Sequence, residues 1–416
     1  MREGILTLDD FKVEGKLVLL RCDINSPIDW ESRKIKDTTR IKRSVPTVKE
    51  LSEKGAKVVI LAHQADPLDY QNFTSLREHR DYLEEFTGKR IQFIEDIAGP
   101  YALDKIKGLK PGEILLLENI RLYTEETIIF EKEVGLSPEE QTQTYLVRRL
   151  SPLADIYICD AFAAVHRSEP SLVAFPLLLP SGAGRLFEEE LEALSRVKTS
   201  PQKPCIYLLG GAKILDAFHM MRTVLKENTA DFILTFGLVG QIFLKAKGYF
   251  LGKDNEEFLE KKGLLTYTKE AKSILDEFAD RVIHPVDVAL DRGRREEFPV
   301  TSIPSEGFIK DIGEGTIKKY LEKIKEAKTI FMNGPAGVYE EENFQKGTEQ
   351  IWREVADSSA FKVIGGGDTI MAAKKFGVEE KFSYICTAGG GMVRFLSGEK
   401  LPVIEALRTS ARKFKS

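Results

Sequence analysis

The sequence predicts an α/β protein made of two doubly wound domains, each built on a parallel sheet. Short apolar, β-branched runs alternate with amphipathic stretches of helical length along the 416 residues, a pattern typical of βαβ units. The apolar runs carry few charges, as strands buried on both faces of a parallel sheet require. The residues that follow the strands change in kind near Pro180, which divides the chain into two parts.

Ten runs are predicted to be strands. Those of the first part are Lys16–Arg21, Lys57–Leu61, Ile91–Ile94, Glu113–Leu117 and Asp155–Cys159. Those of the second part are Cys205–Leu209, Phe232–Thr235, Thr329–Met332, Lys362–Ile364 and Ser383–Cys386. Helices are expected between them, most clearly at Ser44–Lys54, Leu186–Lys198, Thr316–Ala327 and Phe344–Ala356.

Composition excludes several classes of protein. A content of 42% apolar and 9% aromatic residues allows packed cores and argues against disorder. Sixty-one Lys and Arg against 65 Asp and Glu give a net charge of −4, so the overall basic excess of a nucleic-acid-binding protein is missing. No run approaches the ~18 apolar residues of a membrane span, and Met1–Gly4 opens no signal peptide.

The cysteines indicate the compartment. The four lie far apart, without zinc-binding spacing, at Cys22, Cys159, Cys205 and Cys386. We therefore expect buried free thiols in a reducing, cytoplasmic environment.

The loops after the strands predict two different ligands. Before about Pro180 these loops carry Arg, His, Asp and Asn, whereas after it they carry glycine. In open α/β sheets the ligand lies beyond the carboxyl ends of the strands. The first domain is therefore expected to bind an anionic small molecule and the second a phosphate-bearing nucleotide, with Pro180–Gly184 and the charged helix after it as the hinge.

Four glycine clusters follow apolar runs in the second part: Gly210–Gly211, Gly334–Gly337, Gly365–Gly367 and Gly389–Gly391. One such cluster alone is explained as well by a turn that needs positive φ. Four together favour a phosphate site, because backbone N–H groups without a neighbouring Cβ approach phosphate oxygens closely. Neither GxxxxGK[ST] nor GxGxxG occurs, which excludes a P-loop enzyme and disfavours a dehydrogenase.

Charged residues beside these turns and in the first part are the candidate ligand contacts. Lys213 suits a phosphoryl group but also fits a solvated surface lysine, and Asp368 suits Mg²⁺ but also fits a helix N-cap. In the first part, Arg21–Pro27 ends a strand with polar groups. Arginines and a histidine also follow or flank strand ends, and if they converge they bind a phosphate and a carboxylate; they are Arg40, His63, Arg121 and Arg167. No nucleophilic triad or dyad is visible.

Six blocks in this sequence resemble the phosphoglycerate kinase family and occur in the family's order over nearly the whole chain. They are Arg21–Pro27, Leu117–Arg121, Asp160–Ser168, Gly210–Lys213, Asn333–Glu340 and Gly365–Thr369. The His63-Gln64 loop is most similar to the archaeal branch.

The resemblance implies two Rossmann-like domains joined by a helical hinge. Residues 1–180, completed by 400–416, would form a phosphoglycerate-binding domain, and residues 181–399 a nucleotide-binding domain. The implied reaction is reversible phosphoryl transfer between 1,3-bisphosphoglycerate with ADP and 3-phosphoglycerate with ATP. Mg²⁺ enters as MgATP or MgADP. The implied chain is a monomer or dimer without nucleic-acid or membrane partners.

The resemblance also implies residue roles. Six residues would hold the phosphoglycerate: Asp23, Asn25, Arg40, His63, Arg121 and Arg167. The nucleotide phosphates would meet Gly211, Lys213, Gly237, Asn333, Gly337, Gly366, Gly367 and Thr369. Glu340 would bind the ribose and Asp368 the Mg²⁺. Because phosphoryl transfer depends on positioning and on neutralising the equatorial oxygens, Arg40 and Lys213 are the expected transition-state stabilisers.

Three departures from the family pattern stand out. Asp66 replaces an arginine, Ala217 a second lysine and Ala388 a glycine of many members. Two other functions therefore stay open: a kinase of another small carboxylate, and a nucleotide-binding protein without transfer activity.

Overall fold

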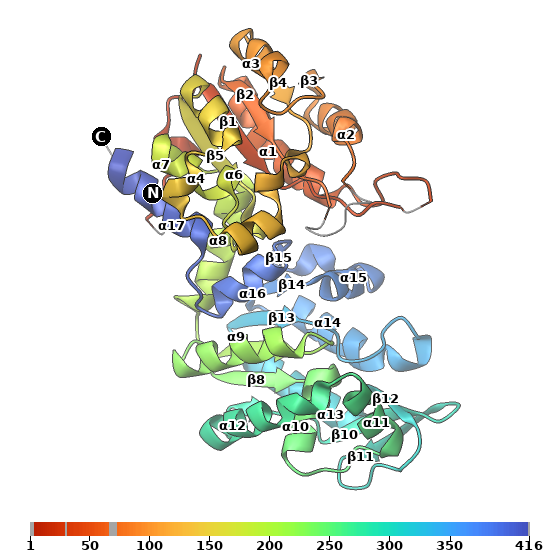
Figure 1. The fold of residues 1–416 in the computed structure, drawn as a ribbon. Helices are drawn as coiled ribbons and strands as arrows, with labels where there is room; N and C mark the ends of the chain where they lie inside the picture. Colours follow the sequence, from red (N-terminus) through yellow and green to blue (C-terminus); the bar gives the residue numbers. More distant parts are fainter. Residues whose placement is uncertain (1–3, 30, 66–72, 415–416) are drawn as a thin grey trace. The chain divides into compact units, whose positions relative to one another are not determined.

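The protein folds into two compact units. A computed structural model describes residues 4–29, 31–65 and 73–414. Unit 1 runs to Glu192 and takes up the chain again from Lys400, whereas unit 2 is the segment Ala193–Glu399. Each unit has its own six-stranded parallel sheet, coloured red to yellow-green in unit 1 and green to blue in unit 2 (Figure 1).

The sheet of unit 1 has the strand order β3-β4-β2-β1-β5-β6. Its strands are β1 Leu17–Cys22, β2 Lys57–Leu61, β3 Ile91–Phe93, β4 Ile114–Leu116, β5 Ile156–Asp160 and β6 Ser181–Ala183. Every residue of β1 is buried, because the strand lies mid-sheet between β2 and β5 with Leu19 opposite both Val59 and Tyr157. The predicted charge-poor strands are thus confirmed, and no end differs from the prediction by more than one residue.

Helices cover this sheet. They are α1 Thr39–Glu53, α2 Arg77–Thr87, α3 Pro100–Lys107, α4 Pro138–Gln141, α5 Tyr145–Leu150, α6 Pro170–Val173 and α7 Phe175–Leu178. In α1 the buried residues Ile41, Val48 and Leu51 share one face and join the core that contains Val18 and Ile60.

The helix α17 (Pro402–Phe414) also belongs to unit 1, although the chain reaches it after unit 2. It lies beside α7 (Figure 1). Ser410 Oγ donates a 3.0 Å hydrogen bond to the Leu179 carbonyl, and the Val403 N–H donates to the Val165 carbonyl at 3.3 Å.

The sheet of unit 2 has the order β15-β14-β13-β7-β8-β9. Its strands are β7 Cys205–Leu209, β8 Phe232–Thr235, β9 Val282–Ile283, β13 Thr329–Asn333, β14 Phe361–Gly365 and β15 Tyr384–Cys386. A second, antiparallel sheet has the order β11-β10-β12, formed by β10 Asp287–Asp291, β11 Arg295–Pro299 and β12 Phe308–Ile312. This small sheet was not predicted.

Eight helices of unit 2 pack around these sheets within the described part of the chain. They are α9 Ile214–Lys226, α10 Gly237–Ala246, α11 Lys253–Lys261, α12 Thr268–Phe278, α13 Glu314–Glu326, α14 Lys346–Asp357, α15 Gly367–Lys375 and α16 Gly390–Leu396. Tyr320 of α13 and Trp352 of α14 are fully buried in one core. The Tyr320 hydroxyl donates to the Thr235 carbonyl at 2.6 Å.

The segment expected as a hinge is a strand. Ser181–Ala183 forms β6 and pairs with β5 of unit 1. The next helix, α8 (Arg185–Lys198), carries the division between the units at Glu192, beyond the predicted residue 180. The start of α8 stays with unit 1 because Arg185 forms ion pairs of 2.6 and 2.7 Å with Asp9 and Glu50.

Two further sequence expectations concern the thiols and membranes. All four cysteines are buried and free, as predicted. None of the helices in the described residues combines the length and apolar character that a bilayer crossing demands.

Candidate active site

The carboxyl-end edge of the unit 1 sheet gathers the predicted polar residues. Asp23 and Asn25 follow β1, His63 follows β2, and Arg121 follows β4 in a short 3-10 turn. These strands are parallel neighbours, so their carboxyl ends meet at one edge. The sequence order of the strands alone does not show this, because β3 is the edge strand.

His63 is surrounded by arginines. Burial lowers the pKa of its imidazole well below the usual range, and the positive charges of Arg21, Arg121, Arg40 and Arg167 lower it further. The predicted convergence of Arg40, Arg121 and Arg167 around His63 is therefore present in unit 1. At neutral pH the ring carries no charge of its own, so the positive potential comes from guanidinium groups.

Arg21 fixes the tautomer of this ring. Its Nη2 lies 2.9 Å from His63 Nδ1, and a guanidinium group donates hydrogen bonds without accepting any. Nδ1 is therefore the acceptor, and the single proton of the neutral ring is on Nε2. Arg21 is itself wholly buried and held by the Ser171 hydroxyl at 3.0 Å and the Cys22 carbonyl at 2.8 Å.

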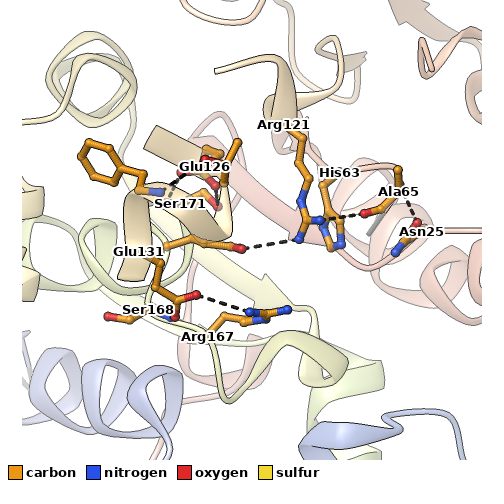
Figure 2. Close-up of polar contacts among 12 residues, drawn as sticks. Asn25, His63, Ala65, Arg121, Glu126, Glu131, Arg167, Ser168 and Ser171 are labelled. Atoms are coloured by element: carbon orange, nitrogen blue, oxygen red, sulfur yellow. Dashed lines mark hydrogen bonds and ion pairs between the residues drawn. The ribbon is translucent and has the colours of Figure 1, made fainter. Parts of the chain in front are cut away.

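Arg121 and Asn25 both hold the backbone of Ala65 (Figure 2). Arg121 Nη1 donates to the Ala65 carbonyl at 2.7 Å, and the Ala65 N–H donates to Asn25 Oδ1 at 2.9 Å. Ala65 has a φ of +85°, which a residue with a Cβ adopts only when its surroundings compensate for the strain. Arg121 also forms a buried 3.4 Å ion pair with Glu169, which limits its rotation.

Arg40 and Arg167 each have a carboxylate partner. Arg40 Nη1 lies 2.5 Å from Asp23 Oδ2, and Arg40 is one-third exposed. Arg167 Nη1 lies 3.4 Å from Glu131 Oε2 (Figure 2). Both guanidinium groups still reach solvent, so an incoming anion can approach their positive charge.

Glu126 lies on the inner side of this cluster. It accepts hydrogen bonds from the Ser171 N–H at 2.7 Å and the Ser171 hydroxyl at 2.6 Å. Burial, reinforced by the charge of Glu169, raises its pKa to about 8. The same residue, Ser171, thus connects Glu126 to Arg21 and His63.

In unit 2 the glycine turns approach one another so closely that side chains are excluded. A Cβ at Gly210 would lie 2.1 Å from the Phe236 ring, and one at Gly237 would lie 2.8 Å from the Gly211 nitrogen. Gly211 and Gly237 have φ values of +71° and +57°, which glycine adopts readily. The glycines here are therefore more than isolated turns, because their backbones form one surface.

Two hollows lie along this surface. One has a volume of about 50 Å³ and contains Lys213, Asn333 and Thr369. The other, of about 220 Å³, contains Gly237, Gly337 and Glu340. They share Gly211, Ala212 and Asp368 in their walls. All ten predicted nucleotide-binding residues line one hollow or the other.

Two of the charged residues that line the smaller hollow, Lys213 and Asp368, are exposed, whereas the third, Asp216, is half-buried. Lys213 precedes the first turn of α9 and Asp368 lies in the first turn of α15. Neither side chain has a hydrogen-bond or ion-pair partner among the described residues. Thr369, in contrast, is buried, and its hydroxyl accepts from the Gly334 N–H at 2.7 Å, so it stabilises the turn.

The donor set for a metal is sparse. No group of three or more His, Cys, Asp or Glu side chains in the described residues is arranged to hold a metal ion. A single exposed carboxylate beside glycine turns suits Mg²⁺ that arrives on nucleotide phosphates, because Mg²⁺ is commonly held by one or two carboxylates plus those phosphates.

Known proteins resemble this chain over its whole length. The family model described as "PGK: Phosphoglycerate kinase" matches residues 8–399. The phosphoglycerate kinase of Methanothermus fervidus is 45% identical over 408 residues, with 98% of each chain covered. That of Pyrococcus horikoshii is 44% identical over 98% of each chain.

The chain belongs to the phosphoglycerate kinase family. Its fold agrees with two solved members. The crystal structure of the Pyrococcus horikoshii enzyme matches with a TM-score of 0.87 at 44% identity, covering 99% of this chain and all of that one. The Coxiella burnetii enzyme matches with a TM-score of 0.81 at 30% identity, covering 97% and 98%.

Family membership establishes the reaction class. The enzyme transfers a phosphoryl group reversibly between ATP and the carboxyl group of 3-phosphoglycerate, the glycolytic step that links 1,3-bisphosphoglycerate and ADP to their products. The predicted similarity to archaeal members is confirmed by relatives such as that of Methanothermobacter thermautotrophicus, 44% identical over 405 residues.

The three departures from the family pattern differ in where they fall. Asp66 lies outside the described residues. Ala217 is buried on α9, one turn beyond Lys213. Ala388 is 2% exposed, and among the described residues it is Gly389 and Gly390, rather than Ala388, that line the smaller hollow. The methyl group of Ala388 is therefore not part of the walls of the smaller hollow.

Four residues of the unit 1 cluster were not predicted: Arg21, Glu126, Glu169 and Ser171. Arg21 could have been identified from the sequence, because an arginine inside a run of Leu and Val residues must have hydrogen-bond partners within the core. The acidic residues and Ser171 could not, since nothing local distinguishes them from surface residues.

Proposed function

We propose that unit 1 binds the phosphoglycerate and unit 2 the magnesium nucleotide, with Arg40 and Lys213 stabilising the transferred phosphoryl group. The observation that supports this most is the convergence of four guanidinium groups around a neutral His63. Such a cluster suits a small ligand that carries both a phosphate and a carboxylate, because arginine binds either group bidentately.

His63 contributes a donor in this proposal. Its Nδ1 is occupied by Arg21, so Nε2 carries the proton and has no partner among the described residues. A neutral N–H donor adds a directed hydrogen bond to an anionic ligand. Asn25 adds another, because its Oδ1 is occupied by the Ala65 N–H while its NH₂ group stays available.

Asp23 has an orienting role. A carboxylate repels an anionic ligand, but its Oδ2 is paired with Arg40. Its other oxygen, Oδ1, is buried without a hydrogen-bond donor. That acceptor suits a hydroxyl group of the substrate, and 3-phosphoglycerate carries one.

On the nucleotide side the glycine turns present backbone N–H groups to the phosphates. Lys213 supplies a mobile positive charge and Glu340 an exposed carboxylate for the ribose hydroxyls. Asp368 would hold the Mg²⁺ of MgATP. The metal would neutralise charge on the phosphate oxygens.

Phosphoryl transfer to 3-phosphoglycerate needs no covalent bond to any of these side chains. A carboxylate oxygen of 3-phosphoglycerate attacks the γ-phosphorus while the bond from that phosphorus to the β–γ bridging oxygen breaks. The attacking carboxylate is already ionised at neutral pH, so no general base is required. Catalysis therefore rests on positioning and on positive charge at the equatorial oxygens.

A coupled assay with 3-phosphoglycerate, ATP and Mg²⁺, with and without EDTA, tests the proposal. Lys213→Ala should lower kcat by at least about 100-fold and leave the Kd for 3-phosphoglycerate nearly unchanged. Lys226→Ala is the control, because Lys226 is exposed at the other end of the same helix. An unchanged kcat for Lys213→Ala removes that residue from the mechanism.

Arg40→Ala should lower kcat and also weaken 3-phosphoglycerate binding, because Arg40 belongs to the unit 1 cluster. Arg90→Ala, at an exposed position between α2 and β3, is its control. Normal 3-phosphoglycerate binding by Arg40→Ala would contradict the assignment of this cluster to the phosphoglycerate.

A further inference from the structure

The larger hollow of unit 2 contains an amide without a partner. Gln241, on α10, lines the cavity of about 220 Å³ and is only 6% exposed. None of the described residues hydrogen-bonds its side chain. Its amide nitrogen and oxygen are not among the fully buried atoms that lack a partner, so they face the hollow and are open to a polar ligand there.

The other polar side chains in the walls are already satisfied or solvated. Lys310 pairs with Asp291 at 2.8 Å and with Glu341 at 2.7 Å. Asp311 pairs with Arg295 at 2.8 Å. Glu340 and Asp368 are exposed to water. Gln241 is therefore the enclosed polar side chain in these walls that still has both of its hydrogen-bonding groups to offer.

The surroundings of Gln241 suit a flat, apolar ring. Aliphatic side chains line much of the cavity, among them Leu238, Leu244, Pro285, Val288, Ile309 and Val338. Such walls bury both faces of an aromatic ring but recognise none of its edges. Discrimination between rings then depends on whatever polar group reaches the edge.

The position of Gln241 along α10 matches a base rather than a phosphate. Gly237, the first residue of α10, packs against Gly211 in the glycine surface. A helix rises 1.5 Å per residue, so Gln241 lies about 6 Å further along the axis from that surface. Glu340, the expected ribose contact, lines the same cavity.

We propose that Gln241 is a specificity-determining residue that hydrogen-bonds the edge of an adenine base. The amide oxygen would accept from the 6-amino group and the amide NH₂ would donate to the adjacent ring nitrogen, the paired donor and acceptor that an amide matches. This inference rests on the proposed function, because it needs the nucleotide in the larger hollow of unit 2.

Comparison of ATP with purine ribonucleoside triphosphate tests the proposal, because the second nucleotide lacks only the 6-amino group. Calorimetry on the full chain should show about tenfold tighter binding of ATP, the contribution typical of one neutral hydrogen bond. Gln241→Leu should reduce this ratio to within about twofold. Equal ratios in the wild type and Gln241→Leu overturn the proposal.

Two controls separate recognition from folding. Leu244→Val removes part of the aliphatic wall, so it should weaken both nucleotides and leave their ratio unchanged. Gln241→Leu without nucleotide should melt close to the wild-type temperature, because no described residue loses a hydrogen bond to the amide. A lower melting temperature means that the amide bonds the protein, which also overturns the proposal. Gln241→Met serves if the leucine variant does not fold.

Competition between ADP and the bound nucleotide distinguishes failure of this inference from failure of the proposed function. If ADP displaces ATP or purine ribonucleoside triphosphate from the wild-type protein, the protein has a nucleotide site that all three share. A Cβ at Gly237 would reach the Gly211 nitrogen. If Gly237→Ala no longer shows displacement of bound nucleotide by ADP, the shared site lies in unit 2. If ADP competition survives there, the nucleotide lies elsewhere and both proposals fail together, whereas an unchanged ATP preference in Gln241→Leu refutes the base contact alone.

Discussion

Glu126→Gln should make the protein more stable at neutral pH and abolish part of its pH dependence. The carboxyl is buried and accepts both hydrogen bonds from Ser171. Its pKa rises from 4.5 to about 8 in the folded protein. A carboxamide has the same shape, keeps an acceptor for the Ser171 N–H and never ionises, so the substitution removes the charge and retains the packing.

The size of the effect follows from the two pKa values. Below pH 4.5 Glu126 is protonated in both the folded and the unfolded chain, so it makes no pH-dependent contribution to the free energy of unfolding there. Between pH 4.5 and 8 the unfolded chain releases the proton while the folded chain retains it, so stability falls as pH rises. At roughly 1.4 kcal/mol per pH unit, the loss by pH 7 is about 3 kcal/mol.

Hydrogen–deuterium exchange during urea unfolding, followed in peptides of unit 1, gives the free energy of unfolding at each pH. The gain of Glu126→Gln over wild type should be near zero at pH 4.5 and grow to about 3 kcal/mol at pH 7. Glu85→Gln, an exposed position on α2, is the matched control and should show no growth. A gain for Glu126→Gln that is constant from pH 5 to pH 8 would refute the reasoning.

Three other substitutions test separate parts of the site. Gly237→Ala and Gly248→Ala should each lose about 1–2 kcal/mol of stability, since both glycines have positive φ. Only Gly237→Ala should lose ATP affinity, because a Cβ at Gly248 meets nothing within 4 Å; equal losses of affinity would count against the glycine surface. Arg21→Met should raise the pKa of His63 and leave its proton shared between both ring nitrogens, seen by nitrogen NMR of the side chain. Retention of the single Nε2–H form would show that Arg21 does not set the tautomer. Asp368→Asn should raise the Mg²⁺ concentration for half-maximal turnover by at least about tenfold, and an unchanged requirement would remove Asp368 from metal binding.

Strands buried on both faces were predictable because burial on both faces requires an almost uninterrupted run of apolar residues. β1 and β7 are uniformly apolar apart from Arg21, and their ends fall within a residue of the prediction. The antiparallel sheet was missed because its edge strand β11 is partly exposed and charged, with Arg295, Glu296 and Glu297. Its central strand β10 has a buried apolar run of only three residues, Val288–Leu290. β6 was taken for a hinge since Ser181-Gly182-Ala183 has no large apolar side chain. It needs none, because a Cβ at Gly182 would lie 2.6 Å from the Phe11 ring.

The glycine turns of the site were predictable for a similar reason: backbones that touch one another exclude side chains, and that exclusion is visible as glycine. The partners of the arginines were not predictable. Arg121 meets Glu169 at a separation of 48 residues, and Glu126 meets Ser171 at a separation of 45. Only the order of strands in the sheet decides which of many acidic residues reaches a given guanidinium group.

The return of α17 to unit 1 has a consequence for how the protein is made. Unit 2 is one uninterrupted segment, Ala193–Glu399, and all of it is synthesised before α17. Unit 1, although begun first, lacks the helix that covers α7 until then. Domains usually fold as they emerge, in chain order. Here the domain that starts last is the first whose sequence is complete, so the earlier one must wait with its α7 face open to chaperones or to other nascent chains.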